Sequence, residues 1–326
     1  MTRSSSLTRF TLIAAIAVMA LAPQTFAATR DALSLIPANA TSVGMVRLAD
    51  ARNSPISRML FTQTDKVSTD GDAAKFLRDA GLQPSKDIDV IVISSAPQGS
   101  LSDETSVLVA AEGRFDVGRL SSAILSRGAT RKPTAAGAYY LFPEKESDSH
   151  RGAVAFISPT LAVAGTERAV AQALIDNAAG GTNFSQAGGL AHEMSRVDPH
   201  ATAWALVDVA RASRMKGAPH VPTQRNGSDQ VIAAALRSVS TVALSAIDTG
   251  DSLKLTATGV SQDDDTRQLL EDTLRGMLSA WRLAIQDKSP QLVSVLRKFT
   301  VTNSANAVTI SGTLSADNLK SLKFNE

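Results

Sequence analysis

Val239-Ser-Thr-Val-Ala-Leu-Ser-Ala-Ile247 and Ser252-Leu-Lys-Leu-Thr-Ala-Thr-Gly259 are two apolar stretches that no helical segment separates. Their alternating pattern and their β-branched residues predict a strand in each. Two strands joined this closely must pair antiparallel, because parallel pairing needs a long crossover between them. The same reasoning applies to residues 90–112 and 138–164, so the sequence predicts antiparallel sheet along much of its length.

Outward from this pair, strand patterns are interspersed with segments of helical spacing, which indicates an α+β protein. The predicted strands are Ser42–Leu48, Val90–Ser94, Ser106–Glu112, Ala138–Phe142, Ala153–Ile157, Leu161–Ala164, Thr202–Val209, Val239–Ile247, Ser252–Gly259, Thr300–Thr302 and Ala307–Gly312. The predicted helices are Ala73–Ala80, Val117–Ser126, Glu167–Asn177, Gln230–Arg237 and Asp264–Gln286, with a continuation over Leu292–Phe299 after Pro290.

The longest predicted helix, Asp264–Gln286, carries one apolar stripe. We expect this stripe to lie in the core, and we expect both tryptophans, Trp204 and Trp281, to be buried. The three acids Asp263–Asp265 invite a metal hypothesis. Acids at a helix start also cap free amides and face the positive end of the helix dipole, so we favour capping. The stripe consists of Leu270, Leu274, Met277, Trp281 and Ile285.

Three sequence landmarks recur in the same order, which suggests an internal duplication. The predicted architecture is α+β with two similar lobes, each an antiparallel sheet with helices gathered on one face. The first lobe would span residues 28–177 and the second residues 192–326, joined by a mobile glycine-rich linker over residues 178–191. The landmark pairs are Ala40–Ala49 with Ala201–Ala210, Val109–Gly113 with Leu255–Gly259, and Leu161–Thr166 with Val308–Thr313.

The first residues have the three parts of a cleavable export signal. Arg3 and Arg9 form a positive head, an apolar run follows from Phe10 to Leu21, and Thr25-Phe-Ala27 offers small residues for cleavage after Ala27. The run is too short to cross a bilayer, which needs roughly 17–25 apolar residues. We therefore expect residues 1–27 to be a signal peptide, and the mature chain to be periplasmic or secreted with no integral membrane segment.

Composition argues against several functions. The formal net charge is +2, and removal of the two signal-peptide arginines brings it to zero, so the mature chain has no overall field that attracts nucleic acid. The chain has no cysteine, so an exported form must be held together by burial alone. Aromatic residues make up only 4%, which argues against polysaccharide binding, because sugars stack on exposed rings.

Three groups of short motifs carry a family resemblance: Leu35–Thr41 before a strand, Glu112-Gly-Arg-Phe-Asp116 with the helix and the Tyr139-Tyr-Leu141 that follow, and Leu161–Thr166 before a helix. In these the chain resembles exported bacterial proteins of an uncharacterised family. The resemblance covers residues 33–177, with a fainter repeat in residues 197–322, where Gly259–Asp263 lacks the Arg-Phe-Asp. It implies an exported protein and no particular activity.

Candidate catalytic residues are few. Ser213-Arg-Met-Lys216 places a lysine one helical turn from a serine, where it can act as a base. His192 and His200 are further candidates, because catalytic residues converge from distant segments. The other interpretation, which we favour, is a chance serine–lysine spacing and solvent-facing histidines.

Candidate metal ligands alternate along one segment between two predicted strands: Glu144, Glu146, Asp148 and His150. In an extended conformation all four would share one face, and oxygen ligands with one imidazole suit a divalent ion. A polar hairpin tip explains the same pattern, and we favour it. Asp87-Ile-Asp89 offers a cation site as well, but aspartate is common at a turn entering a strand.

The sequence contains no motif that specifies a reaction, and it predicts no cofactor. The predicted function is non-enzymatic binding or interaction in the cell envelope. The partner would be an unknown envelope protein or a small apolar ligand, held on a sheet face or in a groove between the lobes. The first alternative is a hydrolase whose site is assembled from distant residues. The second is a peripheral membrane-associated protein that contacts lipid through helix 264–286, although Asp263–Asp265 oppose anionic lipid.

Overall fold

A computed structural model describes most of the chain. The predicted signal peptide and the predicted helix Gln230–Arg237 lie outside the described residues. The described ranges are residues 32–52, 54–56, 72–100, 104–144, 151–181, 183–186, 188–215, 239–286 and 290–321.

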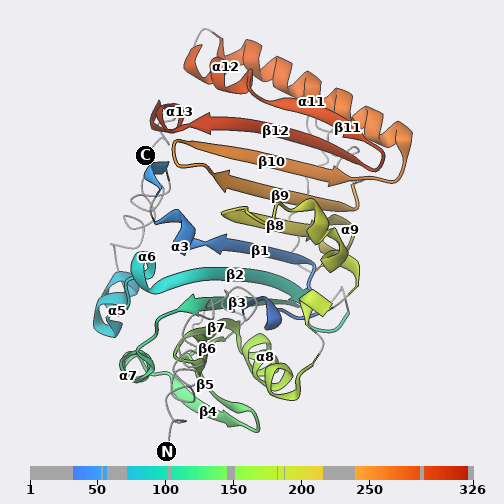
Figure 1. Cartoon of the computed structure of the whole chain (residues 1–326). Helices are drawn as coiled ribbons and strands as arrows, with labels where there is room; N and C mark the ends of the chain where they lie inside the picture. Colours follow the sequence, from blue (N-terminus) through green and yellow to red (C-terminus); the bar gives the residue numbers. More distant parts are fainter. Residues whose placement is uncertain are drawn as a thin grey trace, which may run out of the picture.

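The described strands form one large antiparallel sheet (Figure 1). They are β1 (Ser42–Arg47), β2 (Ile88–Pro97), β3 (Thr105–Gly113), β4 (Thr130–Thr134), β5 (Gly137–Leu141), β6 (Gly152–Ser158), β7 (Leu161–Thr166), β8 (Ala203–Asp208), β9 (Thr241–Asp248), β10 (Ser252–Val260), β11 (Thr300–Ser304) and β12 (Ala307–Ser315). Their order across the sheet is β11-β12-β10-β9-β8-β1-β2-β3-β7-β6-β5-β4. The antiparallel sheet and the mixed helix and strand content are therefore confirmed.

β4 has no counterpart among the predicted strands. Its sequence Thr-Arg-Lys-Pro-Thr has no apolar residue that would mark a buried face, and most of it is exposed. It is a strand because it pairs with β5 at the end of the sheet, where a strand needs only one partner. Pro133 is tolerated there because an edge strand has backbone amides that bond to no neighbour.

The helices follow local signals that the sequence carries. Asp116 accepts a hydrogen bond from the backbone N–H of Arg119 at 3.0 Å and caps one helix, and Gly180, with φ of +63°, ends another. The α-helices are α3 (Leu48–Ala51), α5 (Asp72–Ala80), α6 (Pro84–Asp87), α7 (Val117–Leu125), α8 (Glu167–Ala179), α9 (Val209–Ala212), α11 (Asp264–Ile285), α12 (Pro290–Leu296) and α13 (Ala316–Ser321); η1 (Phe184–Gln186) and η2 (Gly189–Arg196) are 3-10 helices.

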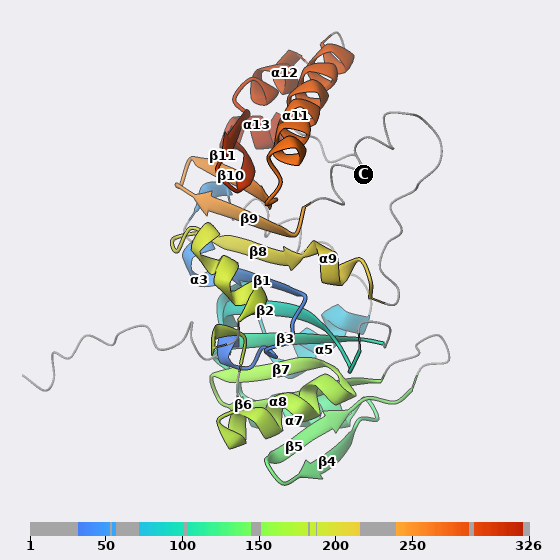
Figure 2. The same cartoon turned by 90° about the vertical axis from the view of Figure 1, so that its right-hand side faces the viewer.

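One sheet runs through both halves of the chain, a point that the sequence left open. β1 and β8 lie side by side in its middle, with Gly44 opposite Ala205 (Figures 1 and 2). The expected linker, residues 178–191, contains η1 and the start of η2, and its Phe184 and Leu190 are buried in the core cluster that also holds residues of β1 and β8. The backbone N–H of Phe184 donates to the carbonyl of Ile36 at 2.9 Å, which ties this segment to the start of the described chain.

Side chains alternate between the two faces of the sheet, and each face is covered differently. On the first, which we call the covered face, α8, η1, η2 and residues 32–36 pack over the strands from β5 to β9. The largest core cluster lies between the sheet and this layer. Ala32 is held by the buried carboxylate of Glu112, which accepts its backbone N–H at 2.9 Å.

The opposite face, which we call the open face, is covered by helices only towards its two ends. α5 and α7 pack over β3, β7 and β6 at one end, and α11 and α12 pack over β10, β12 and β11 at the other. The prediction that helices gather on one face is therefore wrong, because apolar side chains project from both faces and both need cover.

α11 begins as expected but is not buried along its whole stripe. Asp263 accepts the backbone N–H of Thr266 at 2.8 Å, so the capping interpretation is confirmed for this acid. Leu270 and Leu278 are buried, whereas Trp281 is 62% exposed. The expectation that Trp281 lies in the core is wrong, because α12 rather than the end of α11 covers that part of the sheet: Val295 of α12 packs with Leu253 and Leu314.

Candidate binding site

Small residues on adjacent strands hollow out the middle of the open face. The pairing register aligns them, with Gly44 opposite Ala205 and Ala203 opposite Ala246. None of these residues has a side chain larger than a methyl group, so the surface of the sheet is lowest here. Ala257 on the neighbouring strand β10 is a fifth small residue, and the five together form the floor of a hollow in the sheet.

Larger side chains rise around this floor and enclose a volume of 560 Å³. That volume lies within the range of roughly 300–1,000 Å³ that small-molecule sites occupy. We call this cavity the sheet hollow. The large side chains around it are Val46, Ile91, Ile93, Leu244, Leu255, Phe299 and Ile310.

The chemistry of the sheet hollow is apolar. Ser245 and Thr256 also line it, but strand alternation directs their side chains to the covered face, since Ser245 pairs with the buried Trp204. Ile93 is 50% exposed and Leu244 is 43% exposed, and a ligand in the sheet hollow would cover both side chains. Fully burying one such side chain is worth about 1.5–3 kcal/mol, so a ligand that covers them is held by burial.

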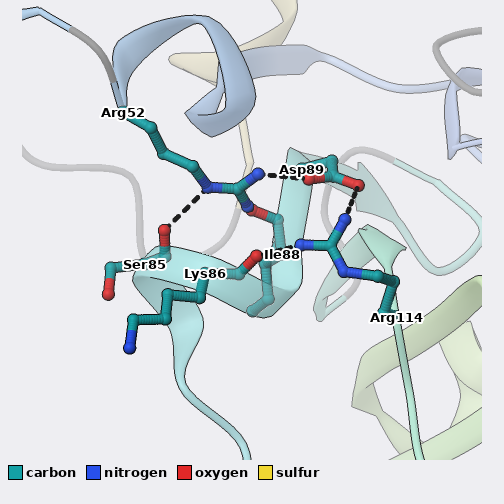
Figure 3. Close-up of polar contacts among 6 residues, drawn as sticks. All are labelled: Arg52, Ser85, Lys86, Ile88, Asp89 and Arg114. Atoms are coloured by element: carbon teal, nitrogen blue, oxygen red, sulfur yellow. Dashed lines mark hydrogen bonds and ion pairs between the residues drawn. The ribbon is translucent and has the colours of Figure 1, made fainter.

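A polar cluster lies at the start of β2, where a bulge falls between Ile88 and Val90 (Figure 3). Asp89 sits in this bulge and accepts from two guanidinium groups, that of Arg52 at 2.6 Å and that of Arg114 at 3.4 Å. The two arginines also donate to the carbonyls of Ser85, Lys86 and Ile88.

These bonds connect segments that are distant in the sequence. Arg52 follows α3, Asp89 belongs to β2, and Arg114 follows β3. The carboxylate of Asp89 is already shared by two cations, and Asp87 accepts the backbone N–H of Gln83 at 2.7 Å. The cluster therefore ties α3 and the segment after β3 to the start of β2. Both aspartates accept from protein donors, which agrees with the structural role favoured for them over a cation site.

Of the candidate catalytic residues, the structure keeps Ser213 and His200 apart. Ser213 donates its hydroxyl to the carbonyl of Ala210 at 3.3 Å, one turn earlier. His200 precedes β8 and Ser213 follows it, and a six-residue strand is about 20 Å long, which is beyond hydrogen-bond reach. His192 lies in η2, and Lys216 lies outside the described residues.

Of the four candidate metal ligands, the structure describes only Glu144. Its carboxylate accepts from Arg151 at 2.6 Å, and this hydrogen bond raises the pKa of the Arg151 guanidinium. Glu146, Asp148 and His150 lie outside the described residues. Within the described ranges, no group of three or more histidine, aspartate or glutamate side chains is placed to hold a metal ion.

A second, polar cavity of 390 Å³ lies at the start of α8. Tyr139 donates its hydroxyl to Glu167 at 2.8 Å there. Burial, followed by this hydrogen bond and the negative charge of Glu167, raises the pKa of Tyr139, so the phenol stays protonated. Arg151 and Arg168 also line the cavity, but Arg151 is already paired with Glu144. The cavity therefore has mixed charge and selects no single class of ligand.

Sequence reasoning predicted binding on a sheet face or in a groove but did not identify the residues of the sheet hollow. The available signal was a glycine or alanine among larger residues in each of four predicted strands, repeated at alternate positions at Ala203 and Ala205. That signal becomes a site only when the cross-strand register is known.

Among the described helices, none is long and apolar enough to cross a membrane.

Comparison of the chain with protein-family models finds no match, and comparison with curated proteins finds none either. Among solved structures, the chain is similar to crystal form IV of TP0453, with 11% identity and a TM-score of 0.49 over 90% of this chain and 96% of that one. For crystal form III of TP0453 the sequence identity is 11% and the TM-score 0.48, over 90% of this chain and 97% of that one. For crystal form I the identity is 12% and the TM-score 0.45, over 89% of this chain and 95% of that one. Similarity at this level identifies neither a family nor a function.

Proposed function

We propose that this chain is an exported, non-enzymatic binding protein that holds a small apolar ligand in the sheet hollow. The observation that carries the proposal is the exposed row of large apolar side chains, among them Ile93 and Leu244, around a floor of glycine and alanine. A large apolar concavity on a protein surface is a common mark of a binding site.

The proposal includes export and duplication. Residues 1–27 would be removed as a signal peptide, which leaves a periplasmic or secreted chain. Support for the duplication comes from the strand order, which is β1-β2-β3-β7-β6 outward from the middle in one direction and β8-β9-β10-β12-β11 in the other. The three sequence landmarks fall on corresponding strands: β1 and β8, β3 and β10, β7 and β12. In this arrangement the sheet hollow spans the junction of the two halves.

A hydrolase is the weaker candidate. The side chains that face into the sheet hollow are aliphatic or aromatic and provide neither a nucleophile nor a base. The hydroxyl of Ser213 is engaged with the carbonyl of Ala210.

The test measures binding of the neutral apolar dye Nile red to the mature chain, residues 28–326. Ala205→Leu and Ala246→Leu place a larger side chain on the floor of the sheet hollow, in space that is open to solvent. We expect each to raise the Kd for the dye by about tenfold or more, because the volume that the ligand needs is filled.

Ile175→Ser is the matched control, because Ile175 is an apolar side chain of α8 that is 45% exposed and lies outside the sheet hollow. It should leave the Kd unchanged. Dye affinity that is equal in the wild type and both filled variants would contradict the proposal. Organic extraction of the purified chain, followed by mass spectrometry, identifies the natural ligand.

A further inference from the structure

The small residues on the floor of the sheet hollow do not form a straight path. Residues that pair directly across neighbouring strands lie side by side on the same face of a sheet. Leu244 pairs with Ala205 on one side and with Ala257 on the other, and its side chain is half-exposed. It therefore blocks the direct line between these two alanines. The whole row consists of Ile93, Gly44, Ala205, Leu244, Ala257 and Ile310.

The neighbouring row carries the floor around Leu244. There Ala203 pairs with Ala246, so the surface beside Leu244 rises no higher than a methyl group. Ala257 is the diagonal neighbour of Ala246, and the low path continues to it between Leu244 and Leu255. A flexible chain follows this bend by rotating between staggered conformers. A rigid fused-ring molecule cannot bend in this way.

The sheet hollow is long and thin. Apart from Phe299, its lining residues lie on six neighbouring strands from β2 to β12 (Figure 1), and at about 4.8 Å per strand these strands span about 24 Å. Along a strand it extends over at most two residues of the open face, such as Gly44 and Val46, which lie about 7 Å apart. A volume of 560 Å³ over this area is about 3–4 Å deep, which is the distance between two carbon atoms in contact. The hollow therefore holds a single layer of ligand atoms.

Large side chains lie at both ends of the sheet hollow. Ile91 and Ile93 lie at the β2 end, and Ile310 and Phe299 lie at the β12 end. The ring of Phe299 packs on Gly312, where a Cβ would come within 2.6 Å of it, so the absence of a side chain lets the ring lie there. An extended chain of carbon atoms advances about 1.25 Å per atom, so the space between the ends takes a chain of about 14–18 carbons.

An extended peptide does not fit the sheet hollow. The strands of its floor have neighbours on both sides, so their backbone groups are already paired within the sheet. The side chains that face into it are aliphatic or aromatic and form no hydrogen bonds. The amides of a bound peptide would lose water without gaining a partner, which is unfavourable. A hydrocarbon has no such groups.

We propose that the sheet hollow takes one flexible acyl chain of about 14–18 carbon atoms, bent around Leu244. The proposal rests on the binding function proposed above and names the class of ligand: a free fatty acid or one tail of a lipid. Leu244 determines specificity, because it excludes rigid fused-ring molecules of similar apolar area. Since no charged residue lines the hollow, the polar head of the ligand lies in solvent.

Displacement of Nile red from the mature chain by saturated fatty acids, from decanoate to docosanoate, tests the length of the ligand. Affinity should rise about twofold with each added carbon, because a chain on the open face is covered on one side and gains about half of the energy of full burial. The rise should stop near octadecanoate, where the chain becomes longer than the sheet hollow.

Leu244→Ala tests the bend. In the wild type, cholesterol should displace the dye about tenfold more weakly than hexadecanoate does, or worse. Leu244→Ala opens the direct line between Ala205 and Ala257, so it should remove most of this difference. Ile93→Ala is the matched control, because Ile93 is a half-exposed member of the same row but lies at its end. It should preserve the preference for the flexible chain.

The outcomes distinguish this inference from the proposed function. Nile red that binds but is displaced equally by every acid, or as readily by cholesterol as by hexadecanoate, would overturn the acyl chain and leave the binding function standing. A protein that binds neither the dye nor any acid would overturn both. Hexadecanoate and its lysophosphatidylglycerol ester carry the same chain, so both should compete. The stronger competitor of the two shows whether the chain arrives as a free acid or as a lipid tail, and either result supports the inference.

Discussion

Asp263 makes the stability of the N-terminal cap of α11 dependent on pH. Its hydrogen bonds from Thr266, first from the side chain and then from the backbone, lower the pKa of the Asp263 carboxyl. A carboxyl whose folded-state pKa lies below its unfolded-state pKa stabilises the fold at neutral pH. That contribution is lost as the pH falls past the ordinary carboxyl pKa towards the lowered one.

Asp263→Asn keeps the acceptor oxygen but does not titrate. We expect the wild type to lose more stability than this variant as the pH falls from neutral to about 3, because only the wild-type cap becomes protonated. The measurement is the difference between their urea unfolding midpoints at each pH. Other carboxyls titrate in both chains and cancel in this difference, so a difference that is independent of pH would contradict the assignment.

Gly113 is fixed by the close approach of another backbone segment. A Cβ at this position would lie 2.1 Å from the carbonyl oxygen of Asp87. Gly113→Ala should therefore lower the free energy of unfolding by about 1–3 kcal/mol. Gly118→Ala in α7 is the control, because its nearest contact, Asp116 Oδ1, would be at 3.6 Å. It should be neutral or stabilising by up to ~1 kcal/mol. Equal urea midpoints for the two variants would refute this account.

At the scale of elements, the two edges of the sheet are protected differently. β4 carries Arg131, Lys132 and Pro133, residues that discourage pairing with another chain. On β11 the carbonyl of Val301 accepts Arg275 of α11 at 3.2 Å, so a helix occupies part of that edge.

Changing Arg131, Lys132 and Pro133 together to threonine should therefore speed aggregation, because the β4 edge becomes a good β-former without charge. Light scattering at a fixed concentration below the unfolding temperature measures the rate. Arg297→Thr combined with Lys298→Thr, at two exposed basic residues before β11, is the control for lost charge. If both variants aggregate at the same rate, loss of charge alone explains the effect.

Elements with a strong apolar period could be predicted from the sequence, and those without one could not. All eleven predicted strands coincide with observed ones, because their alternating side chains meet a covered face. β4 was missed because pairing at the sheet edge, and not burial, makes it a strand. The apolar stripe of α11 indicated which side of the helix faces the sheet, but not how far along the helix that contact extends. Trp281 was therefore predicted to be buried, although it is exposed. The sheet hollow depends on register between Gly44 and Ala205, which no single strand pattern contains.

At the scale of the whole molecule, the pairing of β1 with β8 joins the two halves. Arg47 donates its guanidinium to the carbonyls of Pro199 at 2.8 Å and Ala201 at 3.1 Å. The hydroxyl of Thr41 donates to the sulfur of Met215 at 2.9 Å. Trp204 is buried in the core cluster that also contains residues of β1, β2 and β3. Since this cluster draws on both halves, loss of one half exposes the core of the other.

We therefore expect the two halves to unfold in one cooperative transition. Trp281→Phe leaves Trp204, at the β1–β8 junction, as the only tryptophan, whose fluorescence can be excited selectively. Its fluorescence and the far-UV circular dichroism of the whole chain should give the same urea midpoint, which is the mark of two-state unfolding. Trp204→Ala should lower that midpoint without splitting the transition, because it removes about 3–5 kcal/mol of packing from the shared core. A second transition seen by circular dichroism but not by Trp204 fluorescence would instead mean that one half folds alone.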